Sequence, residues 1–153
     1  MASPACRPPA VALLAALAIL AGGCGGSSRP SGISAEFRRQ ANDTCSRAVG
    51  AIGILDFTAL PDDRGLSRIA QALHEAESRI RGAPAPGETD RRVQARMATG
   101  FAKAAAAVEG YRAGVRASAP DDQRYSRMLA ALGDMGSEGQ RAGTDACVVP
   151  MEA

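Results

Sequence analysis

Apolar residues recur every three or four positions along four successive stretches of the chain, a spacing that places them on one face of an α-helix. The first stretch has apolar positions spaced 4-4-4-3-4-3, namely Ile33, Phe37, Ala41, Cys45, Ala48, Ile52 and Leu55. Ser34, followed by Glu36, predicts a capped helix start. Gly50 and Gly53 weaken the second half of this helix, and Pro61 limits its extent.

The second and third stretches carry the most regular patterns. The second predicts a helix over residues 62–81, with the apolar positions Leu66, Ile69, Leu73, Ala76 and Ile80. Gly82 stands where a C-terminal cap is expected, before a Pro-rich loop. The third predicts a helix over residues 89–117, which at 1.5 Å per residue is about 43 Å long. Its apolar positions are Val93, Met97, Phe101, Ala104, Val108, Tyr111 and Val115.

The fourth stretch begins well and then weakens. It starts at Asp121, and its apolar positions are Tyr125, Met128, Leu132 and Met135. Four glycines follow or interrupt it, at positions 133, 136, 139 and 143. Because each glycine costs about 1 kcal/mol against alanine inside a helix, we expect fraying or a break beyond Gly136. No alternating apolar run of strand length occurs, so the sequence predicts an all-α fold, an up-and-down four-helix bundle.

The N-terminus has a different pattern. Val11–Ala21 is an apolar run too short to span a bilayer, which needs about 20 residues. Arg7 precedes this run and small residues follow it, as is typical of a secretory signal peptide. The segment Leu20–Cys24 (LAGGC) resembles the lipobox of bacterial lipoproteins. The resemblance implies cleavage before Cys24 and a diacylglycerol thioether on its sulfur.

A plain secretory signal, cut near Gly22 or Gly23, would instead leave Cys24 as a free thiol. The lipoprotein hypothesis accounts better for a cysteine at the cut followed by the Gly/Ser-rich stretch 25–32. It divides the chain into a signal peptide (1–23), a lipidated cysteine with a flexible tether (24–32) and a helical bundle domain (33–153). A coil of that length holds the domain about 15 Å from the lipid headgroups.

Composition excludes some functions. Arg7 leaves with the signal peptide, so the remaining chain carries 17 basic and 16 acidic residues. This near-neutral balance gives no case for binding nucleic acid. Aromatic residues are scarce and tryptophan is absent, which weakens any function based on rings stacking on sugars or bases.

Two cysteines remain once Cys6 leaves with the signal peptide and Cys24 takes the lipid. Cys45 and Cys147 form an even pair in an oxidising compartment, which predicts a disulfide. Closing a loop of about 100 residues is worth roughly 4–5 kcal/mol in the chain-entropy model. The alternatives are two free buried thiols or a metal pair. No second Cys or His stands at ligand spacing from either residue.

The disulfide constrains the end of the chain. Cys45 lies twelve residues beyond Ile33, about 18 Å up the axis of the first helix. Cys147 reaches it if the fourth helix breaks near Gly143 and the next residues run back along the first helix. We therefore expect the C-terminal segment to form a strap across that helix. A stagger between the first and fourth helices is the alternative.

Candidate catalytic residues are few. His74, the only histidine, lies at the edge of an apolar face, and position 71 is Gln rather than the Glu of a ferritin-like metal motif. We predict a partly exposed surface residue rather than a catalytic base. The paired acids at 62–63 and 121–122 are explained as helix starts, with carboxylate catalysis as the alternative. No phosphate, dinucleotide or nucleophile motif occurs. The sequence therefore predicts no enzyme, no cofactor and no metal site.

The surface arginines, for example Arg38–Arg39 and Arg91–Arg92, alternate with acids and predict a mixed-charge surface. A contact with anionic headgroups near the tether is the alternative. Three methionines on apolar faces, Met97, Met128 and Met135, are expected in the core.

The whole layout resembles the small lipoproteins common in high-GC Gram-positive bacteria. The features that carry this resemblance are the lipobox, the short tether, a Cys in the first helix (Ala41–Cys45), Pro-Asp turns and the closing Gly143–Cys147. It implies a disulfide-closed helical domain on the outer face of the cell membrane, anchored by Cys24, and supplies no activity. We expect a non-enzymatic interaction module that meets another envelope protein. The alternative is a carrier that binds a small apolar ligand between its helices, which an apolar void of about 300 Å³ or more would favour.

Overall fold

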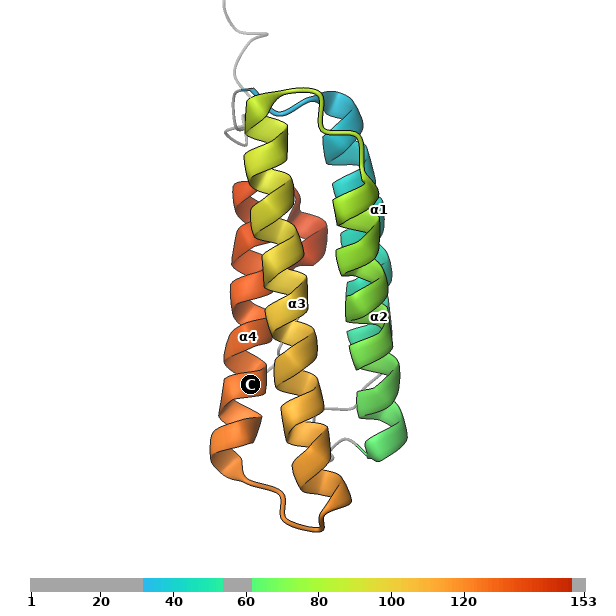
Figure 1. Cartoon of the computed structure of the whole chain (residues 1–153), viewed down its shortest axis with the longest axis vertical. Helices are drawn as coiled ribbons and strands as arrows, with labels where there is room; N and C mark the ends of the chain where they lie inside the picture. Colours follow the sequence, from blue (N-terminus) through green and yellow to red (C-terminus); the bar gives the residue numbers. More distant parts are fainter. Residues whose placement is uncertain (1–31, 54–61, 150–153) are drawn as a thin grey trace, which may run out of the picture.

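A computed structural model describes residues 32–53 and 62–149 of the chain. Its helices are α1 (Ala35–Gly53), α2 (Asp63–Gly82), α3 (Glu88–Arg116) and α4 (Asp122–Arg141), followed by the 3-10 helix η1 (Asp145–Cys147). Figure 1 shows the four long helices side by side along the long axis of the molecule. The all-α four-helix bundle predicted from the sequence is confirmed. The predicted signal peptide, Cys24 and nearly all of the predicted tether lie outside the described residues.

The apolar positions of each helix face one common core. Nearly all of the positions predicted from the helical period are buried, and the three methionines Met97, Met128 and Met135 are among them. Val115 and Tyr125 are partly buried at its edge. Leu55, predicted to extend the first face, lies outside the described residues. Four of these core positions are alanines, each at most 3% exposed, namely Ala41, Ala48, Ala76 and Ala104.

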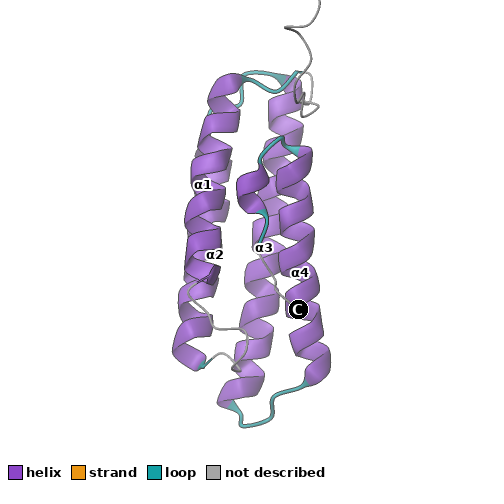
Figure 2. Cartoon of the chain, turned by 180° about the vertical axis from the view of Figure 1, so that it is seen from behind, coloured by secondary structure: helices purple, strands orange, loops and turns teal. Residues whose placement is uncertain are grey.

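Consecutive helices pack against each other, α1 on α2, α2 on α3 and α3 on α4. The bundle is closed between its first and last helices by η1, which contacts both α1 and α4 (Figure 2). The C-terminal segment is thus the strap expected from the sequence. It is built as one short 3-10 turn rather than as an extended chain.

Polar side chains begin the helices as predicted. The hydroxyl of Ser34 accepts a hydrogen bond from the N–H of Phe37 at the start of α1. The carboxylate of Asp62 accepts one from the N–H of Gly65, and that of Asp121 one from the N–H of Gln123. These bonds satisfy helix N–H groups that have no partner within the helix.

The end of α2 differs from the prediction. Gly82 lies inside the last turn, and the helix ends at Ala83 with an extended backbone rather than with a left-handed glycine. The free carbonyl groups there have another partner. The side-chain amide of Gln94 on α3 donates to the carbonyl oxygens of Ile80, Arg81 and Ala83 at 2.7–3.1 Å. A cap supplied by a neighbouring helix makes a glycine cap unnecessary.

The predicted break beyond Gly136 is wrong, because α4 continues to Arg141. Gly136 and Gly139 are buried beneath the strap. A Cβ at Gly136 would lie 3.2 Å from the carbonyl oxygen of Cys147, and one at Gly139 would overlap the Cβ of Cys147. Packing of the strap offsets the intrinsic cost of these glycines in the helix.

The chain turns away from α4 just after the helix ends at Arg141, and the turn is made at Gly143. This residue has φ +73°, the left-handed region that glycine adopts freely. Its N–H donates to the carbonyl of Gln140, and the N–H of Thr144 donates to that of Gly139. This pair of bonds is the Schellman motif, which turns the chain back towards α1.

Candidate functional site

The predicted disulfide joins the middle of α1 to the strap. Cys45 and Cys147 are bonded, their Cα atoms lie 4.6 Å apart, and 102 positions separate them in the sequence. Both side chains are buried, at 0% and 1% exposed. The bond therefore lies inside the core. Gly139 on α4 makes room for it, since any larger residue would meet Cys147.

Cys24, the predicted lipidation site, lies outside the described residues.

The described chain starts at Gly32, and a buried carboxylate fixes its first residues to the start of α3. The Oδ1 atom of Asp90 accepts a hydrogen bond from the N–H of Ser34 at 2.9 Å, and Oδ2 accepts one from Gly87 at 3.5 Å. Asp90 is 1% exposed.

Burial by itself raises the pKa of Asp90, because it disfavours the charged form. Hydrogen bonds from Ser34 and Gly87 outweigh that effect, and the pKa lies below its ordinary value of 3.8. The carboxylate is therefore ionised at neutral pH. It holds the beginning of α1 and the α2–α3 loop together at one end of the bundle (Figure 1).

His74 is exposed on α2, as predicted. Its Nε2 atom lies 3.1 Å from the Oε1 atom of Glu109 on α3, and its Nδ1 atom lies 3.7 Å from Glu77. Within residues 32–53 and 62–149, no group of three or more His, Cys, Asp or Glu side chains is placed to hold a metal ion.

The paired acids begin helices and make an ion pair. Asp62 and Asp121 cap α2 and α4, as described above. Asp63 accepts a hydrogen bond from Nε of Arg112 on α3 at 2.6 Å. This bond lowers the pKa of Asp63, and the positive charges of Arg112 and Arg116 act in the same direction. Three of the four acids thus have defined structural roles.

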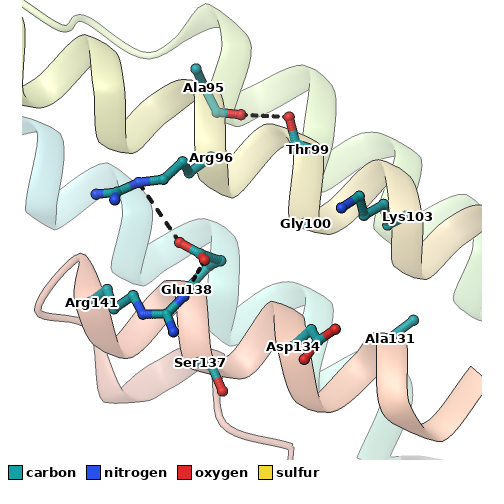
Figure 3. Close-up of a pocket in the computed structure, with 10 residues that line it drawn as sticks. All are labelled: Ala95, Arg96, Thr99, Gly100, Lys103, Ala131, Asp134, Ser137, Glu138 and Arg141. Atoms are coloured by element: carbon teal, nitrogen blue, oxygen red, sulfur yellow. Dashed lines mark hydrogen bonds and ion pairs between the residues drawn. The ribbon is translucent and has the colours of Figure 1, made fainter.

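Two hollows in the described surface follow the seam between α3 and α4. The first has a volume of about 540 Å³ and is open to solvent (Figure 3). Its walls come from both helices: Ala95, Arg96, Thr99, Gly100 and Lys103 on α3, and Ala131, Asp134, Ser137, Glu138 and Arg141 on α4. Arg96 reaches across the seam to Glu138, with 3.8 Å between Nε and Oε2.

A second hollow of about 400 Å³ continues along the same seam. Ala106, Ala107, Gly110 and Tyr111 form its floor, and Arg124 and Arg127 stand on the side of α4. The two hollows have no lining residue in common, but the residues that line them follow one another along the same face of each helix. The row on α4 is spaced 3-4-3-4-3 and consists of Arg124, Arg127, Ala131, Asp134, Glu138 and Arg141. We call the two hollows together the α3–α4 groove.

The groove has small residues along α3 and a positive charge. The row on α3 consists of Ala95, Thr99, Lys103, Ala106, Gly110 and Ala113, and α3 also lines the groove with Arg96, Gly100, Ala107 and Tyr111. Five basic side chains line the groove against two acidic ones. One of these acids, Glu138, is paired with both Arg96 and Arg141.

Two other hollows in the described surface have no excess of basic side chains over acidic ones. The one between α1 and α2 is lined by Glu36 and Asp43 together with Arg39 and Arg79. The one between α2 and α3 holds Glu75 and Glu109 beside His74 and Arg112. These four hollows measure 400–620 Å³, and each is open to solvent. The α3–α4 groove is therefore the candidate functional site.

Comparisons with models of known protein families, with curated proteins and with solved structures gave no match to this chain. Among the described residues, no helix has the length and apolar character needed to cross a membrane.

The disulfide pair was predictable from the sequence, and the α3–α4 groove was not. The signal was present in the heptad-like spacing of the exposed row on α4, and in the run of alanines and glycines on α3 that the core does not require. Both rows run beside the core positions. The sequence alone does not distinguish these two rows from other solvent-exposed positions of the helices.

Proposed function

We propose that this protein is a lipid-anchored protein of the bacterial cell envelope that acts as a non-enzymatic interaction module. Cys24 carries the lipid, residues 25–32 form the tether, and the helical bundle meets another envelope protein. The bundle works close to the outer face of the cell membrane, within about 15 Å of the headgroups.

The observation that carries this proposal is the disulfide between Cys45 and Cys147. Disulfides persist in oxidising compartments and are rare in the bacterial cytosol. Together with the signal-like run Val11–Ala21 and the lipobox-like Leu20–Cys24, the bond supports export followed by acylation. The fold adds a second argument. A bundle with a filled core offers a binding partner its outer surface, and the α3–α4 groove is a hollow of that surface in which basic side chains outnumber acidic ones.

A carrier of small apolar ligands is the second candidate. One observation favours it, the hollow of about 400 Å³ whose floor consists of Ala106, Ala107, Gly110 and Tyr111. This hollow is open to solvent along the outer seam of α3 and α4 rather than enclosed in the core of the bundle, and two arginines flank it. Ligand pockets bury most of the surface of their ligand, so an open hollow of this kind favours a docking surface over a carrier site.

Metabolic labelling with radioactive palmitate tests the anchor. We expect label on the wild-type chain and on a Cys6→Ala variant, which serves as the matched control. We expect none on a Cys24→Ala variant. Label that persists in the Cys24→Ala variant would show that the lipid assignment is wrong. Photo-crosslinking from surface positions in intact cells then tests the interaction. A bundle that crosslinks to no envelope protein from any face would contradict the module.

A further inference from the structure

We infer that the α3–α4 groove binds an acidic amphipathic helix presented by the partner protein. This inference rests on the proposed function and names the surface and the chemistry of the partner.

The first argument is shape. On α3 the groove row runs from Ala95 to Ala113, which at 1.5 Å per residue is about 27 Å. A helix of about 20 residues covers that length. The row on α4 has the 3-4-3-4-3 spacing of positions that receive a third helix packed against a helix pair. Ala106, Ala107, Gly110 and Ala113 are small residues that let a third helix approach this part of α3, and the large Tyr111 beside them is buried.

The second argument is charge. The five basic side chains of the groove are Arg96, Lys103, Arg124, Arg127 and Arg141. Lys103 stands in the middle of the groove and is exposed. Arg127 bonds only the carbonyl and the side chain of Gln123, so its positive charge has no acidic partner among the described residues. Carboxylates on the partner helix supply an acidic partner for Lys103 and for Arg127. Complementary charge of this kind sets the rate and the specificity of docking.

The third argument is placement. Arg124 and Arg127 lie in the first two turns of α4, at the end of the bundle remote from Gly32, where the described chain begins (Figure 1). The groove extends from that end along the length of α4. A protein tethered through its N-terminus thus leaves this part of the groove farthest from the point of attachment.

Two synthetic peptides test the inference directly. Both are about 20 residues long with the same leucines and alanines on one face, and they carry either glutamates or lysines on the other. Their binding to the full chain, purified in a non-ionic detergent, is followed by fluorescence anisotropy. We expect the acidic peptide to bind at least about tenfold more tightly than the basic one. We also expect this binding to weaken as NaCl rises from about 0.05 to 0.5 M.

Variants locate the binding on the groove. Gly110 and Gly50 are exposed helical glycines with open space around them, so a larger side chain fits at either place. Gly110→Trp fills the groove and is expected to abolish binding, whereas Gly50→Trp on α1 is the matched control and leaves it unchanged. Lys103→Glu and Arg127→Glu are each expected to weaken binding at least about threefold. Arg68→Glu, on the exposed side of α2, has no effect.

Three results would overturn the inference: equal binding of the two peptides, no binding of either, or equal effects of the groove and control variants. A dimer in sedimentation experiments that Gly110→Trp abolishes would instead assign the groove to a second copy of the chain. The proposed function and the groove assignment can be tested independently. If palmitate labels the protein and crosslinks form only from α1 and α2, the anchored module stands and the groove assignment is wrong.

Discussion

Two helical glycines, Gly139 on α4 and Gly110 on α3, have very different surroundings. Gly139 lies against Cys147, so that a methyl group at this position would come within 2.6 Å of the Sγ atom. Gly110 on α3 has nothing within 4 Å of the position a Cβ would take. The same substitution therefore has opposite consequences at the two sites.

We predict that Gly139→Ala destabilises the protein by about 1–3 kcal/mol, because the new methyl group overpacks the core around the disulfide. Gly110→Ala is expected to stabilise it by about 1 kcal/mol, the difference in helix propensity. Urea denaturation of both variants, followed by fluorescence of a bound dye or by circular dichroism, measures the free energy of unfolding. Equal effects of the two substitutions would show that the strap does not lie against Gly139.

Asp90 is the residue that attaches the beginning of α1 to α3. We predict that Asp90→Ala lowers the free energy of unfolding by about 1–3 kcal/mol at pH 7, because the N–H of Ser34 loses its partner. The pKa of Asp90 is lower in the folded protein than its ordinary value of 3.8. Its contribution is therefore fully present above pH 3.8 and is lost as the pH falls through the lower, folded-state value.

The pH dependence separates this role from simple packing. Urea midpoints at pH 7 and at about pH 2 are compared for the wild type and Asp90→Ala. We expect the difference between the two proteins to shrink as the pH falls, since the wild-type carboxylate loses its charge when the pH passes through its lowered pKa. A difference that stays constant would mean that the charge of Asp90 contributes nothing.

At the scale of elements, the strap depends on one covalent bond. Replacing both Cys45 and Cys147 by serine removes a constraint across 102 positions of the sequence. We predict a loss of about 4–5 kcal/mol in the free energy of unfolding, from the larger entropy of the unfolded chain. Reduction of the wild type by a thiol reagent is the matched control and should reach the same value. An unchanged urea midpoint in the double variant would show that the strap holds without the bond.

The helices and the disulfide could be predicted from the sequence because they depend on local patterns and on the pairing of two cysteines. Residues such as Phe37, Leu73 and Met128 repeat at the helical period, and the core they form is the main favourable term in folding. Asp62 and Asp121 are local caps, so their role depends only on their neighbours in the chain.

The features that the sequence did not predict depend on contacts between distant residues. Gly136 and Gly139 look like helix breakers until the strap is placed against them. The end of α2 looks like a glycine cap until Gln94 of α3 is seen to bond its carbonyl groups. The groove likewise depends on the register between α3 and α4, which local patterns do not specify.

At the scale of the molecule, the bundle is a chain of neighbouring helices closed by the strap. Each of α1, α2 and α3 packs on the helix that follows it, and the interface between α2 and α3 is the most extensive. The first and last helices meet through η1, which contacts both of them. Removing the strap should therefore loosen the two outer helices before the inner pair.

We predict this pattern for amide hydrogen exchange in the Cys147→Ser variant, whose strap is no longer bonded to α1. Exchange should speed up most in α1 and α4, on the residues that face η1, and least where α2 packs on α3. Mass spectrometry of peptides from the exchanged protein resolves the four helices separately. The matched control is Gly50→Ala, which alters an exposed position of α1 without touching the strap. Uniform acceleration in all four helices would mean that the bundle opens as a single unit. In that case the strap stabilises the whole fold, and α1 and α4 do not open separately from α2 and α3.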